Sequence, residues 1–214
     1  MILFLPLAAL LTIAAAPLTA QNRDAGTLSI RSAGREIGRE EFVVQNTRQG
    51  GASGTTIVSR TRSPSVTPQF TQEAVLERRP DGSFVAMQVT RGPGRVLAEL
   101  ARNTVRVRTT SVGSEAIREL AAPALLVGLA DSAFALYTAV ADLATPEGRA
   151  ITGLFPVTGK QVIFTAQRLT GDGDQGTRII MAGEIAGTIW MDDSGRVTRL
   201  QFPASGIEIV RLRQ

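Results

Sequence analysis

The side chains that most often carry out chemistry in proteins are scarce in this chain. Histidine and cysteine are absent from all 214 residues, and Lys160 is the only lysine. Their absence removes histidine-based triads, cysteine nucleophiles, zinc sites of the ordinary ligand type and haem ligation. No Ser-x-x-Lys spacing precedes Lys160, which follows Gly159 at the start of an expected strand and is typical of a solvated turn residue. We therefore expect no catalytic residue, no metal and no cofactor.

Carboxylates are the chemical groups that remain. The 19 Asp and Glu residues are scattered, so no pair can be chosen for glycoside chemistry. Asp172-Gly173-Asp174, with Glu184 further on, faintly resembles a calcium loop. An EF-hand would need flanking helices and further oxygen ligands, so a hairpin turn is the favoured interpretation. An enzyme that uses carboxylates is the least favoured hypothesis of function.

One long apolar stretch stands apart from the rest of the chain. Ala121 to Ala144 reads AAPALLVGLADSAFALYTAVADLA, with Asp131 and Asp142 as its only charges. Leu and other apolar residues recur at three- and four-residue spacing after Pro123, which predicts a long helix near residues 123–143. A second membrane span is disfavoured, because it would place Asp131 near the middle of the bilayer at a cost of roughly 2.5–3.5 kcal/mol.

The segments on both sides of this stretch have the pattern of β-strands. From Gly26 to Val112 the chain reads as an antiparallel meander of about seven strands, and a second meander follows from Arg149 to the end. Turns such as Pro80-Asp81-Gly82 separate the strands. We expect a mainly β (α+β) fold: a strongly curved antiparallel sheet or half-barrel of about ten or more strands around one long apolar helix.

The predicted helix leaves two interpretations of the interior open. At about 1.5 Å per residue it would be as long as strands of nine or ten residues, so it could lie within the curved sheet. Either it fills the hollow as core, or it leaves a cleft for an acyl chain or another apolar ligand. In the second case the candidate ligand-binding residues are Leu125, Leu126, Leu129, Phe134, Tyr137 and Trp190.

The first twenty residues predict export. They carry no charged side chain, and Ala20 is followed by a polar chain, as at the end of a secretory signal peptide. The lack of Lys or Arg near Met1, and the large Leu18 three residues before the expected cleavage, leave an uncleaved membrane anchor as the alternative. Residues 21–214 are expected to form one β-rich domain, located in the periplasm or secreted and held together without disulfides.

The charge pattern limits the partners. The net charge is +4 and the arginines are scattered, several of them alternating with apolar residues as in Val105-Arg106-Val107-Arg108. A nucleic-acid reader would need clustered basic groups and aromatic stacking platforms, but the chain has one Trp and one Tyr. We expect no nucleic-acid partner and favour a solvated basic sheet face. A weak peripheral contact with anionic membranes is the alternative. No protein partner is indicated.

The overall layout resembles the bacterial exported half-barrel domains, which are uncharacterised, and more distantly the periplasmic lipoprotein carriers. The likeness rests on the apolar insertion from Pro123 to Ala144, followed by IWMDDSGRVTRLQFP and IEIVRLR. The W-x-D-x-x-G-R-V stretch from Trp190 to Val197 resembles the strand-turn-strand of such domains. The resemblance to the carriers implies a half-barrel that holds lipid chains, but it carries no functional residue over to this chain.

These observations lead to two main hypotheses. The first is a non-enzymatic, exported periplasmic or envelope-associated protein that binds a lipid or other apolar ligand between helix and sheet. The second is a structural or interaction scaffold of the envelope, with a filled core and no ligand.

Overall fold

The computed structural model describes residues 21–49, 52–63, 69–171 and 176–213. The predicted signal peptide and the Asp172-Gly173-Asp174 turn lie outside these residues. The described chain is built almost entirely of strands: β1 (Gln21–Ser32), β2 (Arg35–Gln49), β3 (Ala52–Ser63), β4 (Phe70–Arg78), β5 (Phe84–Arg91), β6 (Gly94–Ala101), β7 (Thr104–Ser111), β8 (Ser114–Ala121), β9 (Leu126–Gly128), β10 (Arg149–Phe155), β11 (Lys160–Thr170), β12 (Thr177–Gly183), β13 (Gly187–Met191), β14 (Val197–Phe202) and β15 (Ile207–Arg211).

All of these strands belong to one 15-stranded sheet. Its order is β8-β7-β6-β5-β4-β3-β2-β1-β15-β14-β13-β12-β11-β10-β9, so each half is a simple meander. The two halves join where β1 pairs with β15, with Ile30 opposite Ile209. Neighbouring strands are antiparallel except β9 and β10, which are parallel. The sheet therefore ends in two edges, β8 and β9.

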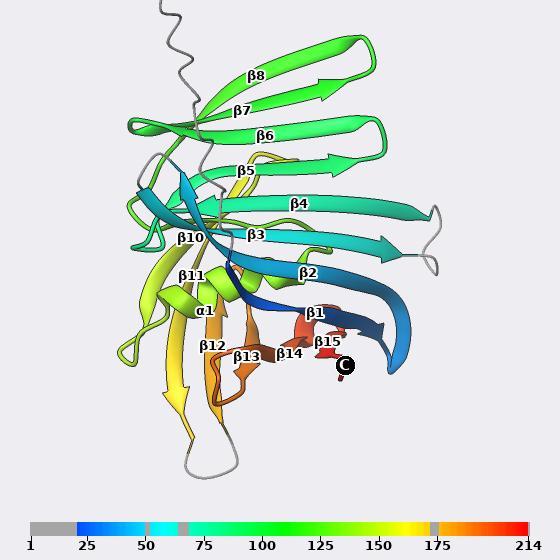
Figure 1. Cartoon of the computed structure of the whole chain (residues 1–214), viewed down its shortest axis with the longest axis vertical. Coiled ribbons are helices and arrows are strands. Elements are labelled where there is room, and N and C mark those ends of the chain that lie inside the picture. Colours follow the sequence, from blue (N-terminus) through cyan, green and yellow to red (C-terminus); the bar gives the residue numbers. More distant parts are fainter. Residues whose placement is uncertain (1–20, 50–51, 64–68, 172–175, 214) are drawn as a thin grey trace, which may run out of the picture.

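The sheet is strongly curved, and its hollow holds the only α-helix of the described chain, α1 (Tyr137–Leu143). Figure 1 shows the strands of the two halves running in crossed directions, with α1 lying between them. Side chains alternate across each strand, so every second residue faces the hollow. In β4 the hollow-facing residues are Gln72, Ala74, Leu76 and Arg78, and all four are buried. The curved antiparallel sheet and its two meanders confirm the mainly β prediction.

The long helix predicted near residues 123–143 is wrong. Ala121 is the last residue of β8, Leu126–Gly128 form β9, and helix begins only with the 3-10 turn Phe134–Leu136 that leads into α1. This extended stretch is tightly packed at Gly128, where a Cβ would lie 2.5 Å from Met87 Sδ. A fully buried helix and a fully buried strand are both apolar on all sides. The spacing of apolar residues in such a run therefore does not distinguish the two.

A helix of seven residues depends on tertiary contacts for its stability. Arg168 donates from Nη2 to the carbonyl of Ala141 at 2.6 Å, near the C-terminal end of α1. The buried Arg78 pairs with Asp142 on α1 at 3.0 Å between Nη1 and Oδ2. Arg23 of β1 contacts the same carboxylate from outside. Charged side chains of the sheet therefore bind the helix at its last turn. Among the described helices, none is long and apolar enough to cross a membrane.

A pair of leucine substitutions tests how this segment folds. Leu129 is 0% exposed and packs beside Gly153, whereas Leu125 is only half-buried. We expect Leu129→Ala to lower the free energy of unfolding by about 2–5 kcal/mol, because it leaves a cavity in the core. Leu125→Ala should cost less than about 2 kcal/mol. Urea denaturation measures both. In a long helix the two residues would share one face, so equal losses at both positions would contradict the extended conformation.

Candidate functional site

A pocket with mainly apolar lining residues lies at one end of the hollow; we call it the apolar pocket. It has a volume of about 310 Å³ and lies where the end of β10, the β12–β13 turn and the β14–β15 turn meet the segment that precedes α1. Its lining residues are Ala130, Asp131, Ser132, Phe134, Tyr137, Phe155, Glu184, Ile185, Ala186, Phe202, Ala204, Ser205 and Ile207. The pocket is at the low end of the size range of small-molecule sites.

Three aromatic rings form the centre of the apolar pocket. The ring centroid of Phe202 lies 5.9 Å from that of Phe134 and 5.1 Å from that of Tyr137, the second pair edge-on. Phe202 follows Leu200 on the hollow-facing side of β14; Leu200 is fully buried, but Phe202 is only partly so. Gly187 on β13 leaves room for it, since a Cβ there would lie 3.0 Å from Phe202 Cδ1. The core thus extends into a partly uncovered aromatic cluster.

The charged residues that line the apolar pocket are both acidic. Glu184 already has partners: its Oε1 accepts a hydrogen bond from the Ile163 amide at 2.8 Å, and Oε2 lies 3.9 Å from Lys160 Nζ. Asp131 is exposed and forms no ion pair with any residue that the structure describes. Burial raises the pKa of the Tyr137 hydroxyl, and the negative charge of Asp131 raises it further. Asp131 therefore leaves one negative charge, unpaired within the described residues, in the lining of the pocket.

A buried carboxylate holds one wall of this pocket in place. Glu40 on β2 is 0% exposed and accepts three hydrogen bonds: from Ser59 Oγ at 2.6 Å, from the Phe134 amide at 2.8 Å and from the Ala135 amide at 2.9 Å. Burial raises the pKa of Glu40 to about 7, although these hydrogen bonds lower it in part. Glu40 thus satisfies the first backbone amides of the 3-10 turn, which would otherwise be buried without acceptors.

Two neighbouring side chains hold the residues just before that turn. Gln72 on β4 donates to the carbonyl of Asp131 at 2.6 Å, and the Thr61 hydroxyl on β3 donates to the carbonyl of Ser132. Ser132 has a φ of 68°, a left-handed conformation that a non-glycine residue adopts only when its surroundings hold it. We call Glu40, Ser59, Thr61 and Gln72 the Glu40 cluster. It binds one side of residues 131–135, whose other side lines the apolar pocket.

The predicted ligand-binding residues are divided among three environments. Phe134 and Tyr137 line the apolar pocket. Leu126 and Leu129 are buried in the core, and Leu125 is half-buried just before β9. Trp190 lies outside the apolar pocket, on the face of β13 that points away from the hollow, where the Arg199 guanidinium stacks 4.8 Å from its ring centroid. The structure therefore brings two of the six residues together.

Sequence reasoning missed the residues that complete the site. Phe202 is the last residue of β14, because Pro203 follows it and ends the strand. An aromatic residue at a strand end was a detectable candidate for the edge of a pocket. Glu40 was also detectable, since it occupies the same alternation phase as Phe42 and Val44, which form the apolar part of that face. An acid at a core-facing position requires a buried partner.

Within the described residues, no group of three or more Asp and Glu side chains is placed to hold a metal ion. Comparison with known protein families, with characterised proteins and with solved structures finds no match to this chain. The resemblance to half-barrel domains and lipoprotein carriers therefore stays a prediction, and function has to be argued from the pocket.

The buried Glu40 predicts an unusual dependence of stability on pH. Its pKa is raised from 4.5 to about 7 on folding, so the folded protein holds this proton more tightly than the unfolded chain does. Its contribution to stability is therefore fully present below pH 4.5 and is lost as the pH rises through about 7, a change on the order of 3 kcal/mol.

Urea unfolding at about pH 5 and about pH 8 measures this change. In Glu40→Gln the neutral amide cannot titrate. The stability of this variant relative to the wild type should therefore rise between about pH 5 and about pH 8. Glu41→Gln is the matched control, because Glu41 is exposed on the other face of the same strand and should keep the wild-type dependence. The same pH dependence in Glu40→Gln and the wild type would contradict the assignment.

Proposed function

We propose that this protein is a non-enzymatic binding protein that holds one apolar chain or ring in the apolar pocket. The observation that carries the proposal is the aromatic cluster in which the ring of Phe202 contacts those of Phe134 and Tyr137; Phe134 and Phe202 are partly exposed, and Tyr137 is buried beneath them. Partly uncovered aromatic and aliphatic side chains around a concavity are typical of small-molecule sites.

The proposed site is at the end of the helix, rather than along its length. Leu129, Leu136 and Val140 are each 0% exposed, so the space between α1 and the sheet is filled by side chains. A ligand would enter beside the first turn of the helix and cover the aromatic rings there. The Glu40 cluster supports this arrangement, because a wall held by four hydrogen bonds needs little reordering when a ligand binds.

The charges at the rim favour a particular class of ligand. Asp131 and Glu184 line the pocket, and no Lys or Arg does so. A carboxylate or phosphate head group would be repelled by Asp131, whereas a neutral or cationic head group would not. The proposed ligand is therefore an apolar molecule with a neutral or cationic polar end.

The scaffold hypothesis is kept as the second candidate, because the filled interior beneath α1 is what a scaffold without ligand would have. Export is a further part of the proposal and rests on residues 1–20 alone. In the exported protein the ligand would come from the envelope or the medium. An intact mass lacking these residues, measured on protein isolated from its native cells, would support export by cleavage. A mass that includes them would favour the anchor.

A homologous series of ligands tests the binding proposal. Nonan-1-ol, nonylamine and nonanoate share one apolar chain and differ only in the charge of the head group. We expect the alcohol and the amine to raise the melting temperature and to bind in calorimetry. Nonanoate should bind about tenfold more weakly, owing to repulsion by Asp131. Native mass spectrometry of protein from its native source would show whether such a ligand co-purifies.

Two alanines provide a matched pair of variants. Ala186 lines the apolar pocket and Ala182 does not, but both are exposed residues of the same hairpin. Ala186→Trp should fill the entrance and weaken binding of nonan-1-ol by about tenfold or more, whereas Ala182→Trp should leave it unchanged. Equal affinity in both variants would contradict the site. A wild type that binds none of the three probes would favour the scaffold.

A further inference from the structure

A second pocket lies at the other end of β14 and β15, and we call it the arginine pocket. It has a volume of about 710 Å³, and its lining residues are Asp192, Arg196, Thr198, Arg199, Val210, Arg211, Leu212 and Arg213. Half of these residues are arginines. They come from the β13–β14 turn, from β14, from β15 and from the residues that follow β15. We propose that the arginine pocket binds a phosphate group.

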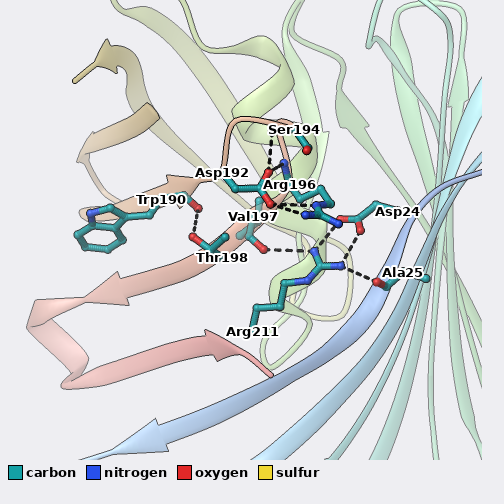
Figure 2. A network of polar contacts seen from close by, with 9 residues as sticks. All are labelled: Asp24, Ala25, Trp190, Asp192, Ser194, Arg196, Val197, Thr198 and Arg211. Atoms are coloured by element: carbon teal, nitrogen blue, oxygen red, sulfur yellow. Dashed lines mark hydrogen bonds and ion pairs between the residues drawn. The ribbon is translucent and has the colours of Figure 1, made fainter. Parts of the chain in front are cut away.

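One of the four arginines forms the fixed base of this pocket. Arg211 donates to both carboxylate oxygens of Asp24 on β1, at 2.9 Å and 2.7 Å, and also to the backbone carbonyls of Ala25 and Val197. Its guanidinium lies 5.3 Å from the ring centroid of Phe42. Figure 2 shows Arg211 reaching across from β15 to Asp24 and Ala25. With its Nη donors in use, Arg211 holds three strands together and has little capacity left for a ligand.

The other three arginines retain hydrogen-bond donors. Arg196 uses Nε and Nη2 for Asp192, at 2.9 Å and 2.8 Å, and its Nη1 has no acceptor among the described residues. Arg199 pairs through Nη2 with Glu208 at 2.7 Å; its Nε is buried, and its Nη1 has no acceptor among the described residues. Within the described residues, no ion pair involves Arg213. Each guanidinium carries five N–H groups, so donors remain on all three.

The local charge also favours an anion. Asp24, Asp192 and Glu208 pair with three of the four guanidinium groups, which leaves one positive charge in excess. Burial raises the pKa of Asp192, but the hydrogen bonds and charge of Arg196 together lower it below the usual value, so this pair stays ionised. The contacts with Asp192 and Glu208 orient Arg196 and Arg199 before any ligand binds.

The number of donor groups distinguishes phosphate from a carboxylate. A carboxylate has two oxygens and is satisfied by one guanidinium fork, whereas a phosphate group offers three or four oxygens to several forks. Arg196, Arg199 and Arg213 line one concavity from three different backbone positions. The phosphate could belong to a small phosphate ester or to an anionic phospholipid, since both present the same oxygens.

This site does not depend on the apolar pocket. Arg199 and Phe202 are three residues apart on β14, so the two pockets lie about 10 Å or more apart along the strand. Their charges also differ, since acids line the apolar pocket and arginines line this one. Failure of either proposal would leave the other untouched.

Trp190 supplies the readout for a test. It is the only Trp of the chain, and its ring stacks on Arg199, which lines the arginine pocket. Inorganic phosphate should therefore change the fluorescence of Trp190 in a saturable manner when it replaces chloride at constant ionic strength. If sodium chloride added alone to a low-salt sample produced the same change, the effect would be charge screening and the proposal would be overturned.

Three arginine variants make the test specific. Arg196→Gln and Arg213→Gln should each weaken phosphate binding by about tenfold, which is the loss expected for one charged hydrogen-bonding group. Arg95→Gln is the matched control, because Arg95 is an exposed arginine on β6 and its loss changes the net charge equally. The same loss in all three variants, or no loss in the first two, would overturn the proposal.

Vesicles distinguish the two sources of phosphate. If the group belongs to a lipid, vesicles containing phosphatidylglycerol should co-sediment the wild type, free phosphate should compete, and Arg213→Gln should reduce the bound fraction. If it belongs to a soluble ester, phosphate should titrate Trp190 while phosphatidylglycerol vesicles sediment no more protein than phosphatidylcholine vesicles do. Failure of both the phosphate titration and the phosphatidylglycerol arm would overturn the proposal.

Discussion

The buried carboxylate of Glu40 is the interaction on which the interior of this protein depends. A curved sheet that encloses a chain segment must satisfy the amides and carbonyls of that segment, because water does not reach them. Glu40 accepts from the amides of Phe134 and Ala135, while Thr61 and Gln72 donate to the two carbonyls just before them. The free energy that burial of a carboxylate costs is thereby offset by three hydrogen bonds, including one from Ser59.

The Glu40 cluster belongs to a larger set of polar side chains on the hollow face of β2, β3 and β4. Arg78 continues the set toward Asp142, so the inserted segment is bound by the sheet near its start and near its end. Apolar contacts fill the space between, with Leu136 and Val140 fully buried. Non-directional burial would allow the segment to slide, whereas hydrogen bonds of this kind define one position. The position of the inserted segment therefore determines the shape of the apolar pocket.

The pairing of β1 with β15 decides where the two pockets lie. It brings the start of the described chain, including Asp24, against Arg211 near the other end of the chain. Because β14 and β15 continue the same sheet, one end of these strands carries the arginine pocket and the other end carries Phe202 and Ile207 of the apolar pocket. One pair of strands thus separates an acidic, aromatic concavity from a basic one.

The sequence by itself determined most of the strands and the turns between them, since alternation and Gly- or Asp-containing turns are local properties of the chain; the edge strand β8 (Ser114–Ala121) was not predicted. The meander before Val112 and the one after Arg149 follow from them, as does the exclusion of histidine and cysteine chemistry. The segment from Ala121 to Ala144 could not be read in the same way, because uniform apolarity shows burial but not conformation. Only the tertiary structure decided that Leu126–Gly128 pair with β10 and that helix is confined to the end. It likewise decided that Phe134 meets Phe202 and that Arg196 meets Arg213 in one pocket, because contacts between residues distant in the chain depend on how the whole sheet curves.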